Sequence, residues 1–497
     1  MSFFLKAKKI DISTGSQSII MLNQDEAWHY GIRAGDKVSL SFGKNKVNTE
    51  ANISKSRIKK GQIGIYRDIW QKYPIKPNQI IQLDFQDRPE SIKAIKEKLL
   101  GKRLNYQQYD SIIKDVISNR LSRTQIAYFI ASGFLSQFSN EEIYYLTKAI
   151  ADNGEKIKYR GIVADKHSIG GLAGNRTTMV VVPIIAALGI RIPKTSSRAI
   201  TSPSGTADTM EVLAPVSFPA RKIKKIVDKT NGCLVWGGGL NLAPADDKLI
   251  KVTYTLALEP YTKVLVSIMA KKVATGVTHL VIDMPYGETT KVPDLRSAKI
   301  IKKKFEYLAR KFNIKLKIVL TKGSDPIGRG VGPVLEARDV LRVLQQKENK
   351  PVDLENKAIK LAGTLIELVG RAKKGQGAAL AWQTLISGKA WGKMSQIIKA
   401  QGGKGKVDAN DLTIGAVKYY YNSPNSGKII FTDNKVINDL CRTLGAPSEK
   451  MAGIYFNKEY GDKVKKGERL FTLYARSEDR IKLAKKALEK SKIFKIR

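Results

Sequence analysis

The hydrophobic period changes twice along this chain, and these two changes constrain its fold more than any other feature. Up to residue 86, apolar residues form short runs between glycine turns, a pattern typical of strands. From residue 91 to residue 150 they recur with the period of amphipathic helices. After residue 161, short apolar runs alternate with glycine-rich turns and helices, which predicts an α/β domain with a largely parallel sheet.

The same patterns predict individual elements. We expect strands at residues 18–22, 37–42, 63–66 and 80–85, and then helices around Ile95, Ile113, Phe129 and Leu146. Ser122 is a candidate N-cap of the third helix, and Ser139 or the closer Asn140 is a candidate for the fourth. Further strands are expected at residues 162–164, 234–236, 280–282, 316–320, 415–417, 428–431, 451–456 and 461–464, before a closing helix near Asp479.

Two segments of the α/β part need a separate interpretation. Residues Met179 to Leu188 fit either a strand or a helix, and we interpret them as a buried helix. Residues 245–273 are helical and interrupt the strands, so we expect them to return to the helical lobe. The predicted fold class is α/β and multidomain, with a β-rich N-terminal domain (1–87), a helical lobe (88–155 and 245–275), an α/β lobe (156–244 and 276–405) and a C-terminal α/β subregion rich in strands (406–497).

Composition excludes several classes of protein. No apolar run among the 497 residues is long enough to span a bilayer, and the apolar side chains at the start precede the lysines, the reverse of a secretory signal. We therefore expect a cytoplasmic protein that does not bind membranes. Two cysteines are too few for a disulfide framework or a structural zinc site, and three histidines argue against a multi-histidine site, so no metal is expected.

Positive charge is in large excess, with 87 Lys and Arg against 45 Asp and Glu and a formal net charge of +42. One interpretation is a polyanionic partner such as a nucleic acid. The other is a solvated, lysine-rich surface, which we favour because the charge is spread along the chain and no nucleic-acid-binding motif accompanies it. An anionic small substrate agrees with both interpretations.

A first motif, DKHSIGG at residues 165–171, continues into GNRTT at residues 174–178 and leads into the apolar helix expected from Met179. Backbone N–H groups of a glycine-rich strand-to-helix turn bind anions, and the helix dipole favours negative charge there. Lys166 would add a cation and Ser168 a hydroxyl donor. His167 is equally consistent with a functional group and with a structural, hydrogen-bonded imidazole.

A second motif, TSSRAITSPSGTAD at residues 195–208, crowds Ser and Thr hydroxyls around the single Arg198 and precedes a helix expected at residues 208–213. Hydroxyl-rich segments are usually exposed loops. Apolar residues flank this one, however, which indicates a cleft between core elements. There the hydroxyls would bind phosphate as neutral donors, and Arg198 would give a bidentate charged contact.

A third motif begins at Glu259, where Pro260 suits the first position of a helix. Ser267 and Lys271 follow at helical spacing, so the three polar side chains would share one edge of that helix. This edge would read a base or a ribose. The alternative is a helix cap followed by a solvated face.

A fourth motif is the glycine-rich run GSDPIGRGVGP at residues 323–333. It fits a second anion-binding loop or a rigid turn of the scaffold, and we favour the scaffold.

These motifs together resemble one group of enzymes. KHSIGG at residues 166–171 and SSRAITSPSGTADTMEVL at residues 196–213 are similar to the thymidine and pyrimidine nucleoside phosphorylases. The archaeal AMP phosphorylases are more similar still, because SIMAKK at residues 267–272 and DPIGRGVGPVLEARDVL at residues 325–341 also have their character. The strand-rich N-terminal extension fits too, since the nucleoside enzymes begin at the helical lobe. The resemblance covers nearly the whole chain.

The resemblance implies a helical lobe and an α/β lobe with the substrates between them, and an N-terminal domain used in assembly of at least a homodimer. It implies that AMP and phosphate give adenine and ribose 1,5-bisphosphate, with CMP and UMP as further substrates. Phosphate is then a co-substrate, and no cofactor is implied. A specific nucleic-acid partner is not expected.

The resemblance also assigns residues by motif position. The proton donor falls on Glu259, and the nucleotide contacts fall on Gly171, Ser197, Arg198, Ala199, Ile200, Thr201, Ser202, Thr206, Ser267 and Lys291. Phosphate-contacting positions of the nucleoside enzymes fall on Lys166, Ser168, Ser196 and Thr206, with His167 inside the same motif. Lys271 matches a lysine that reads the base.

Two departures bear on the substrate. Glu259 stands where the family usually has Asp, and Val252 stands where the nucleoside enzymes have an arginine that reads the pyrimidine. The missing arginine and the N-terminal extension argue against the nearest alternative, a thymidine or uridine phosphorylase. Anthranilate-type phosphoribosyltransferases share the architecture but need magnesium, and no acidic pair for that metal stands out. A nucleic-acid-binding protein is the alternative from another class.

Overall fold

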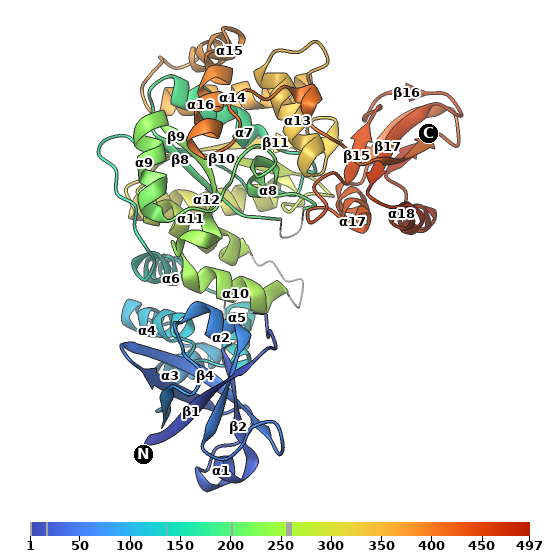
Figure 1. Ribbon diagram of the computed structural model, residues 1–497. Helices are drawn as coiled ribbons and strands as arrows, with labels where there is room; N and C mark the ends of the chain where they lie inside the picture. The colour runs from blue at the N-terminus through green and yellow to red at the C-terminus, as the bar shows by residue number, and fades with distance from the viewer. Residues whose placement is uncertain (1, 16–17, 136, 200–201, 255–260) are drawn as a thin grey trace. The chain divides into compact units, whose positions relative to one another are not determined.

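The computed structural model describes residues 2–15, 18–135, 137–199, 202–254 and 261–497, and the chain divides into two compact units (Figure 1). The first unit comprises Met1–Asn153 and Ala243–Lys263, and the second comprises Gly154–Leu242 and Val264–Arg497. No helix in these described ranges is long and apolar enough to cross a membrane.

The first unit begins with a closed barrel whose strands follow the order β1-β5-β2-β4-β3-β6. The strands are β1 (Ser2–Ile10), β2 (Ile19–Asn23), β3 (Lys37–Phe42), β4 (Asn45–Ser54), β5 (Gln62–Tyr66) and β6 (Ile80–Phe85), with short helices α1 (Gln24–His29) and α2 (Arg67–Lys72). The four predicted strands are present. The sequence patterns missed β1 and β4, whose inward positions hold small or single apolar residues such as Ala7, Val47 and Ala51, so alternation is weak.

Helices form the rest of the first unit: α3 (Ser91–Leu99), α4 (Tyr106–Ile117), α5 (Arg123–Leu135), α6 (Asn140–Asp152) and α10 (Pro244–Tyr254). All four predicted helices of the lobe are present, and α10 packs against α4 and α5. Ser122 accepts a hydrogen bond from Gln125 N, as expected of a cap. At α6 the cap is Ser139, whose hydroxyl accepts from Glu142 N, and Asn140 is already the first helical residue.

The second unit contains a parallel sheet of the predicted kind. Strands β7 (Ala164–Ser168), β10 (His279–Tyr286) and β11 (Lys315–Lys322) pair in the order β11-β10-β7, and β8 (Ile192–Ser196) pairs with β9 (Gly232–Trp236), all in parallel. The strand expected at residues 162–164 begins later, because Ile162 is exposed and Val163 makes only an isolated bridge to Arg191. Lys166, His167 and Ser168 therefore lie in β7 itself, and the turn follows them.

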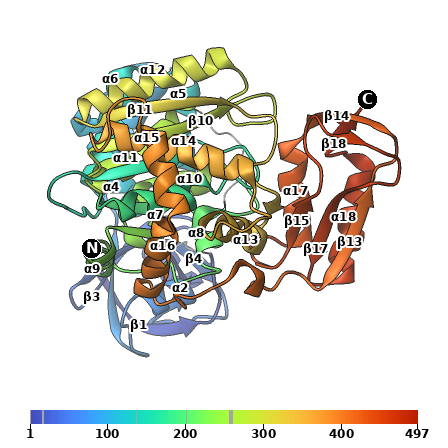
Figure 2. The same cartoon turned by 90° about the horizontal axis from the view of Figure 1, so that it is seen from above.

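The predicted buried helix is α7 (Thr177–Ala187), and every residue from Thr177 to Ala186 is buried. It packs against α14, α15 and α16 (Figure 2). The other helices of this part are α8 (Thr206–Met210), α9 (Ala220–Thr230), α11 (Tyr261–Ala274), α12 (Leu295–Lys311), α13 (Pro333–Leu344), α14 (Val352–Leu368), α15 (Gly377–Ile386) and α16 (Lys389–Ala400), with short 3-10 turns at Gly237–Leu240 and Ala409–Asp411. Of the segment expected to return to the helical lobe, α10 lies in the first unit, whereas α11 belongs to the second unit from Val264 onward. The helix expected at residues 208–213 thus begins at Thr206 and ends at Met210.

The C-terminal part of the second unit is antiparallel. One sheet has the order β12-β15-β17-β13 and another the order β16-β14-β18. The elements are β12 (Gly330–Val331), β13 (Val417–Asn422), β14 (Gly427–Thr432), α17 (Asn434–Leu444), β15 (Gly453–Phe456), β16 (Lys463–Val464), β17 (Arg469–Ala475), α18 (Glu478–Lys490) and β18 (Phe494–Ile496). The loop at residues 323–333 supplies β12, and Asp339 accepts hydrogen bonds from Arg329 N and Gly330 N, which agrees with the interpretation of this loop as scaffold.

A buried ion pair ties α3 to α6 in the first unit. Lys98 Nζ lies 2.7 Å from Glu142 Oε1, and the two side chains are 1% and 2% exposed. The same oxygen accepts hydrogen bonds from Leu104 N and Tyr109 Oη. Burial opposes ionisation of Glu142, but the donors outweigh it and hold the pKa of this carboxyl below its ordinary value.

We expect Lys98→Met to destabilise the first unit by about 3 kcal/mol, the lower end of the range for breaking a buried pair, because Glu142 keeps its other donors. The matched control is Lys114→Met, which removes an equally short pair between Lys114, whose side chain is largely exposed, and Asp110. Chemical denaturation followed by circular dichroism should show a large change in the midpoint for the first variant and almost none for the second. Equal changes would show that burial of the pair is unimportant.

Candidate active site

The lysine of the first motif lies at the start of α7. Lys166 Nζ donates hydrogen bonds to Thr177 Oγ1 at 2.7 Å and to Thr178 Oγ1 at 3.2 Å, and the residue is fully buried. Burial lowers the pKa of Lys166 to about 8, although the charge of Asp283 opposes that shift. The predicted cation is therefore placed beside the N-terminus of a buried helix, where backbone N–H groups also favour an anion.

The serine of the same motif is held by a carboxylate that the sequence patterns did not single out. Ser168 Oγ donates to Asp283 Oδ2 at 2.9 Å, and Asn175 Nδ2 lies 3.2 Å from Ser168 Oγ and 3.1 Å from Asp283 Oδ2. Asp283 reaches them because it pairs with Ser168 across the parallel ladder of β7 and β10. The hydroxyl hydrogen expected to face phosphate is thus engaged with Asp283 in this state.

The glycines of the turn are required by geometry. Gly170 and Gly171 have φ values of +90° and +98°, a region that favours glycine. A Cβ atom on Gly171 would lie 2.4 Å from Lys291 N and 3.0 Å from Thr290 Cα, whereas a Cβ on Gly170 would have open space up to the Lys291 side chain at 3.8 Å. Gly171 and Lys291, both expected in the nucleotide site, are therefore brought together.

A second buried carboxylate lies one residue before Lys166. Asp165 lies 3.4 Å from Lys194 Nζ and 2.6 Å from Lys272 Nζ, and all three side chains are almost completely buried. Burial, reinforced by the charges of Lys272 and Lys194, holds the pKa of the neighbouring His167 well below its ordinary value. His167 is therefore a neutral imidazole at pH 7, which agrees with either of its two interpretations.

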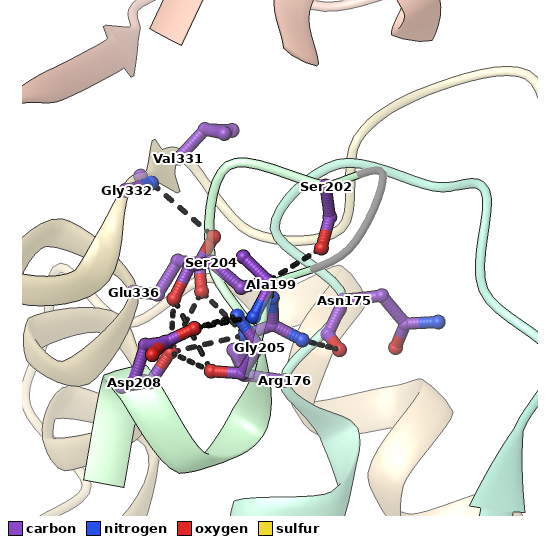
Figure 3. A network of polar contacts seen from close by, with 12 residues as sticks. Asn175, Arg176, Ala199, Ser202, Ser204, Gly205, Asp208, Val331, Gly332 and Glu336 are labelled. Atoms are coloured by element: carbon purple, nitrogen blue, oxygen red, sulfur yellow. Dashed lines mark hydrogen bonds and ion pairs between the residues drawn. The ribbon is translucent and has the colours of Figure 1, made fainter. Parts of the chain in front are cut away.

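The second motif folds into a compact loop around Asp208 (Figure 3). Asp208 Oδ2 accepts from Ala199 N at 2.7 Å and from Gly205 N at 2.8 Å. Gly205 has no room for a side chain, because a Cβ would lie 2.5 Å from Ser197 O. Ser202 Oγ donates to Ser204 O at 2.7 Å, which closes the far side of the loop. Ile200 and Thr201 lie outside the described residues.

Arg176 and Glu336 also hold this loop in place. Arg176 donates to Ser204 O and to Thr209 Oγ1, and its guanidinium forms a close ion pair with Glu336 (Figure 3). Thr209 Oγ1 also donates to Glu336 Oε2 at 2.9 Å. The loop that carries most of the expected nucleotide contacts is therefore fixed by buried charges.

The arginine of the second motif is paired within the protein. Arg198 donates to both oxygens of Glu211, at 2.9 and 2.7 Å, and to Asp208 Oδ1 at 3.1 Å, and its guanidinium lies over the Trp236 ring. The bond from Arg198, helped by Lys450, lowers the pKa of Glu211 to about 2. Arg198 is bidentate toward Glu211, so an anion would have to share it with these carboxylates, and the expected bidentate contact to phosphate stays a prediction.

The remaining predicted residues lie on several elements. Thr206 is the first residue of α8, and Ser196 ends β8, where its hydroxyl donates to Val235 O at 3.4 Å. Lys271 Nζ donates to Ser267 Oγ at 3.3 Å, so these two side chains share one edge of α11 as their spacing predicted. Glu259 lies outside the described residues.

Several residues of the site were missed by sequence reasoning. Asn175 and Arg176 stood inside the first motif but received no role. Asp283 directly follows a predicted strand, and polar residues at the carboxyl ends of parallel strands are the rule at α/β sites, so a signal was present. Glu336 sits inside an ordinary helical pattern, and its role depends on long-range contacts that no local pattern reveals.

The two turn glycines give a matched test of the close approach to Lys291. Both Gly170→Ala and Gly171→Ala put a side chain at positive φ, which costs roughly 1–2 kcal/mol. Only Gly171→Ala must also displace the backbone of residues 290–291. Denaturation should therefore show a clearly larger loss of stability for Gly171→Ala. If the two variants are equally stable, the turn does not depend on this contact.

The chain contains three known sequence domains. The glycosyl transferase family helical bundle domain matches residues 92–154, the glycosyl transferase family a/b domain matches residues 160–391, and the pyrimidine nucleoside phosphorylase C-terminal domain matches residues 429–494. Among solved structures, anthranilate phosphoribosyltransferase from Thermus thermophilus superposes with a TM-score of 0.53 at 17% identity, covering 62% of this chain and 99% of that one. At this identity the likeness shows the shared fold alone.

Similarity to curated proteins extends over nearly the whole chain. AMP phosphorylase of Methanococcus maripaludis (strain C5) is 40% identical over 96% of this chain and 94% of its own length. AMP phosphorylase of Pyrococcus furiosus is 41% identical with the same coverage, 96% and 94%. A putative thymidine phosphorylase of Legionella pneumophila (strain Paris) is 40% identical over 95% of this chain and 91% of its length. Together with the three domains, these matches show that the chain belongs to the AMP phosphorylase family of pentosyltransferases.

Proposed function

We propose that this enzyme cleaves AMP with phosphate to give adenine and ribose 1,5-bisphosphate, and that CMP and UMP are further substrates. The observation that carries the proposal is the similarity, over nearly the full length of both chains, to proteins named AMP phosphorylase. The position of Lys166 at the start of α7, where its Nζ donates to Thr177 and Thr178, supports it, because a helix N-terminus beside a lysine is the kind of place where a phosphate is stabilised.

In the proposed reaction a phosphate oxygen attacks C1′ of the ribose while the bond from C1′ to the base nitrogen breaks. The electron pair of that bond stays on the base, which takes up a proton. We assign the attacking phosphate to Lys166, Ser168 and Thr206, and the 5′-phosphate to Arg198, Thr201, Ser202 and Lys291 as a group. Glu259 is the proposed acid that protonates the leaving base.

We also propose a cellular setting for the enzyme. The enzyme would be cytoplasmic and would assemble at least as a homodimer through the barrel domain. Nucleotides and phosphate would be its partners, without a metal or cofactor.

The second candidate is a thymidine phosphorylase, favoured by the name of the Legionella relative. Against it, Val252 stands at the position expected to read the pyrimidine. The barrel does not separate the two candidates, because the Legionella relative matches 95% of this chain. The two candidates differ in whether a 5′-phosphate is required.

The substrate test compares AMP, CMP and UMP with adenosine, cytidine, uridine and thymidine, with and without phosphate. We expect phosphate-dependent release of free base from the nucleotides alone, with ribose 1,5-bisphosphate as the sugar product identified by mass. Cleavage of the nucleosides alone would place the enzyme with the second candidate and remove the assignment of the 5′-phosphate residues.

The acid is tested by two substitutions of one residue. Glu259→Gln should lower kcat by ~10²–10⁴-fold, the usual contribution of general-acid catalysis, with little change in AMP binding. Glu259→Asp should keep most of the activity, because it preserves the carboxyl group and restores the residue usual in the family. Full activity of the Gln variant would show that another group protonates the base.

A further inference from the structure

Asp283 contacts side chains from several elements. One of these side chains, Lys357, lies far outside every sequence motif. Besides Ser168 and Asn175, it has Lys357 Nζ 3.4 Å from Oδ1 and Lys166 Nζ 3.9 Å from Oδ2. Lys357 comes from α14, which packs against β7 and β10. Asp283 and Lys166 are fully buried, and the Lys357 side chain is only 9% exposed. One carboxylate thus serves two buried cations.

We propose that Asp283 and Lys357 are positioning residues for the attacking phosphate, an inference that rests on the proposed function. Asp283 fixes the side chains of Ser168 and Asn175 and keeps Lys166 in its charged form. Lys357 balances the charge of Asp283, so that an approaching phosphate meets an excess of positive charge.

The need for Lys357 follows from electrostatics. A carboxylate 3.9 Å from Lys166 is required to keep a buried ammonium charged, but on its own it would also cancel the attraction that Lys166 offers to a phosphate. A second cation 3.4 Å from the same carboxylate restores the net positive charge at the end of β7. Both lysines are therefore needed if Lys166 is to stay charged and the site is to keep a net positive charge toward phosphate.

The pH dependence follows from the groups that surround Lys166. Asp283, Lys357, Arg176 and Asp165 face it from β10, α14, the turn and its own strand, and Lys194 interacts with it from β8. Burial brings the pKa of Lys166 down to about 8, and Asp283 is the strongest influence in the opposite direction. Without the charge of Asp283 that pKa falls further, so Lys166 loses its proton at a lower pH.

The first experiment measures the Kd of radiolabelled inorganic phosphate by equilibrium dialysis between pH 6 and pH 9. Asp283→Asn keeps an oxygen that accepts from Ser168 but removes the charge. We expect the ratio of its Kd to that of the wild type to rise by about tenfold for each unit by which the pKa of Lys166 has fallen. Titration of phosphate itself is common to both proteins and cancels in this ratio.

The matched control is Glu355→Gln, which neutralises another buried carboxylate on α14, one that is paired with Lys350 at 2.8 Å. It lies outside the site, so its Kd ratio should stay flat over the same pH range. A flat ratio for Asp283→Asn as well would overturn the role of Asp283.

The second experiment replaces Lys357. Lys357→Met should raise the Kd and the KM for phosphate by about tenfold or more while the KM for AMP stays near the wild-type value. Lys357→Arg should restore phosphate affinity because it restores the charge, and Lys350→Met serves as the control on the same part of the fold. Equal losses of phosphate affinity in Lys357→Met and Lys350→Met would overturn the role of Lys357.

Failure of this inference can be told apart from failure of the proposed function. If the wild-type enzyme binds no phosphate and releases no base from nucleotides, the function itself is wrong. If the wild type does both and the variants match their controls, the function stands, and Asp283 and Lys357 are structural residues only.

Discussion

The second unit depends on the burial of α7 along its whole length. A helix with no polar face must be covered on every side, and α14, α15 and α16 pack against it. Its two ends are polar, and at the N-terminus the first N–H groups have no partner within the helix. Among the described residues, the N-cap Arg176 makes no side-chain capping bond there. Burying α7 therefore creates a place in the interior where negative charge is stabilised.

Three carboxylates fix the loops and side chains around the N-terminus of α7. Asp208 gathers the backbone of residues 199 and 205, Glu336 holds Arg176 under the same loop, and Asp283 holds Ser168. Burying so many charges is costly unless each is paired and hydrogen-bonded, and replacing them with apolar groups would often be as stable. These carboxylates contribute orientation, because a hydrogen-bonded carboxylate holds the donor groups around it in the geometry that catalysis needs.

Sequence periodicity predicted most of the elements but few of the contacts. The helices around Ile95 and Leu146 and the buried α7 were predicted because their apolar spacing is strong. Strands β1 and β4 were missed because their inward positions hold small or single apolar residues, so the alternation is weak. The pairing of Arg198 with Glu211, and of Lys166 with Asp283, joins residues that no local pattern connects. The meeting of Gly171 with Lys291 was expected only through the family resemblance.

Part of the positive charge of the chain is buried, on lysines that are paired with carboxylates. Lys98 in the first unit has its own carboxylate, Glu142. In the second unit, Lys194 and Lys272 share Asp165, and Lys166 and Lys357 share Asp283. Each of these two clusters places two lysines on one buried carboxylate, and burial lowers the pKa of Lys194 to about 7 and that of Lys166 to about 8. The chain has a formal net charge of +42, and under the proposed function the part that acts on the anionic substrate is at β7, where Asp283 serves both Lys166 and Lys357.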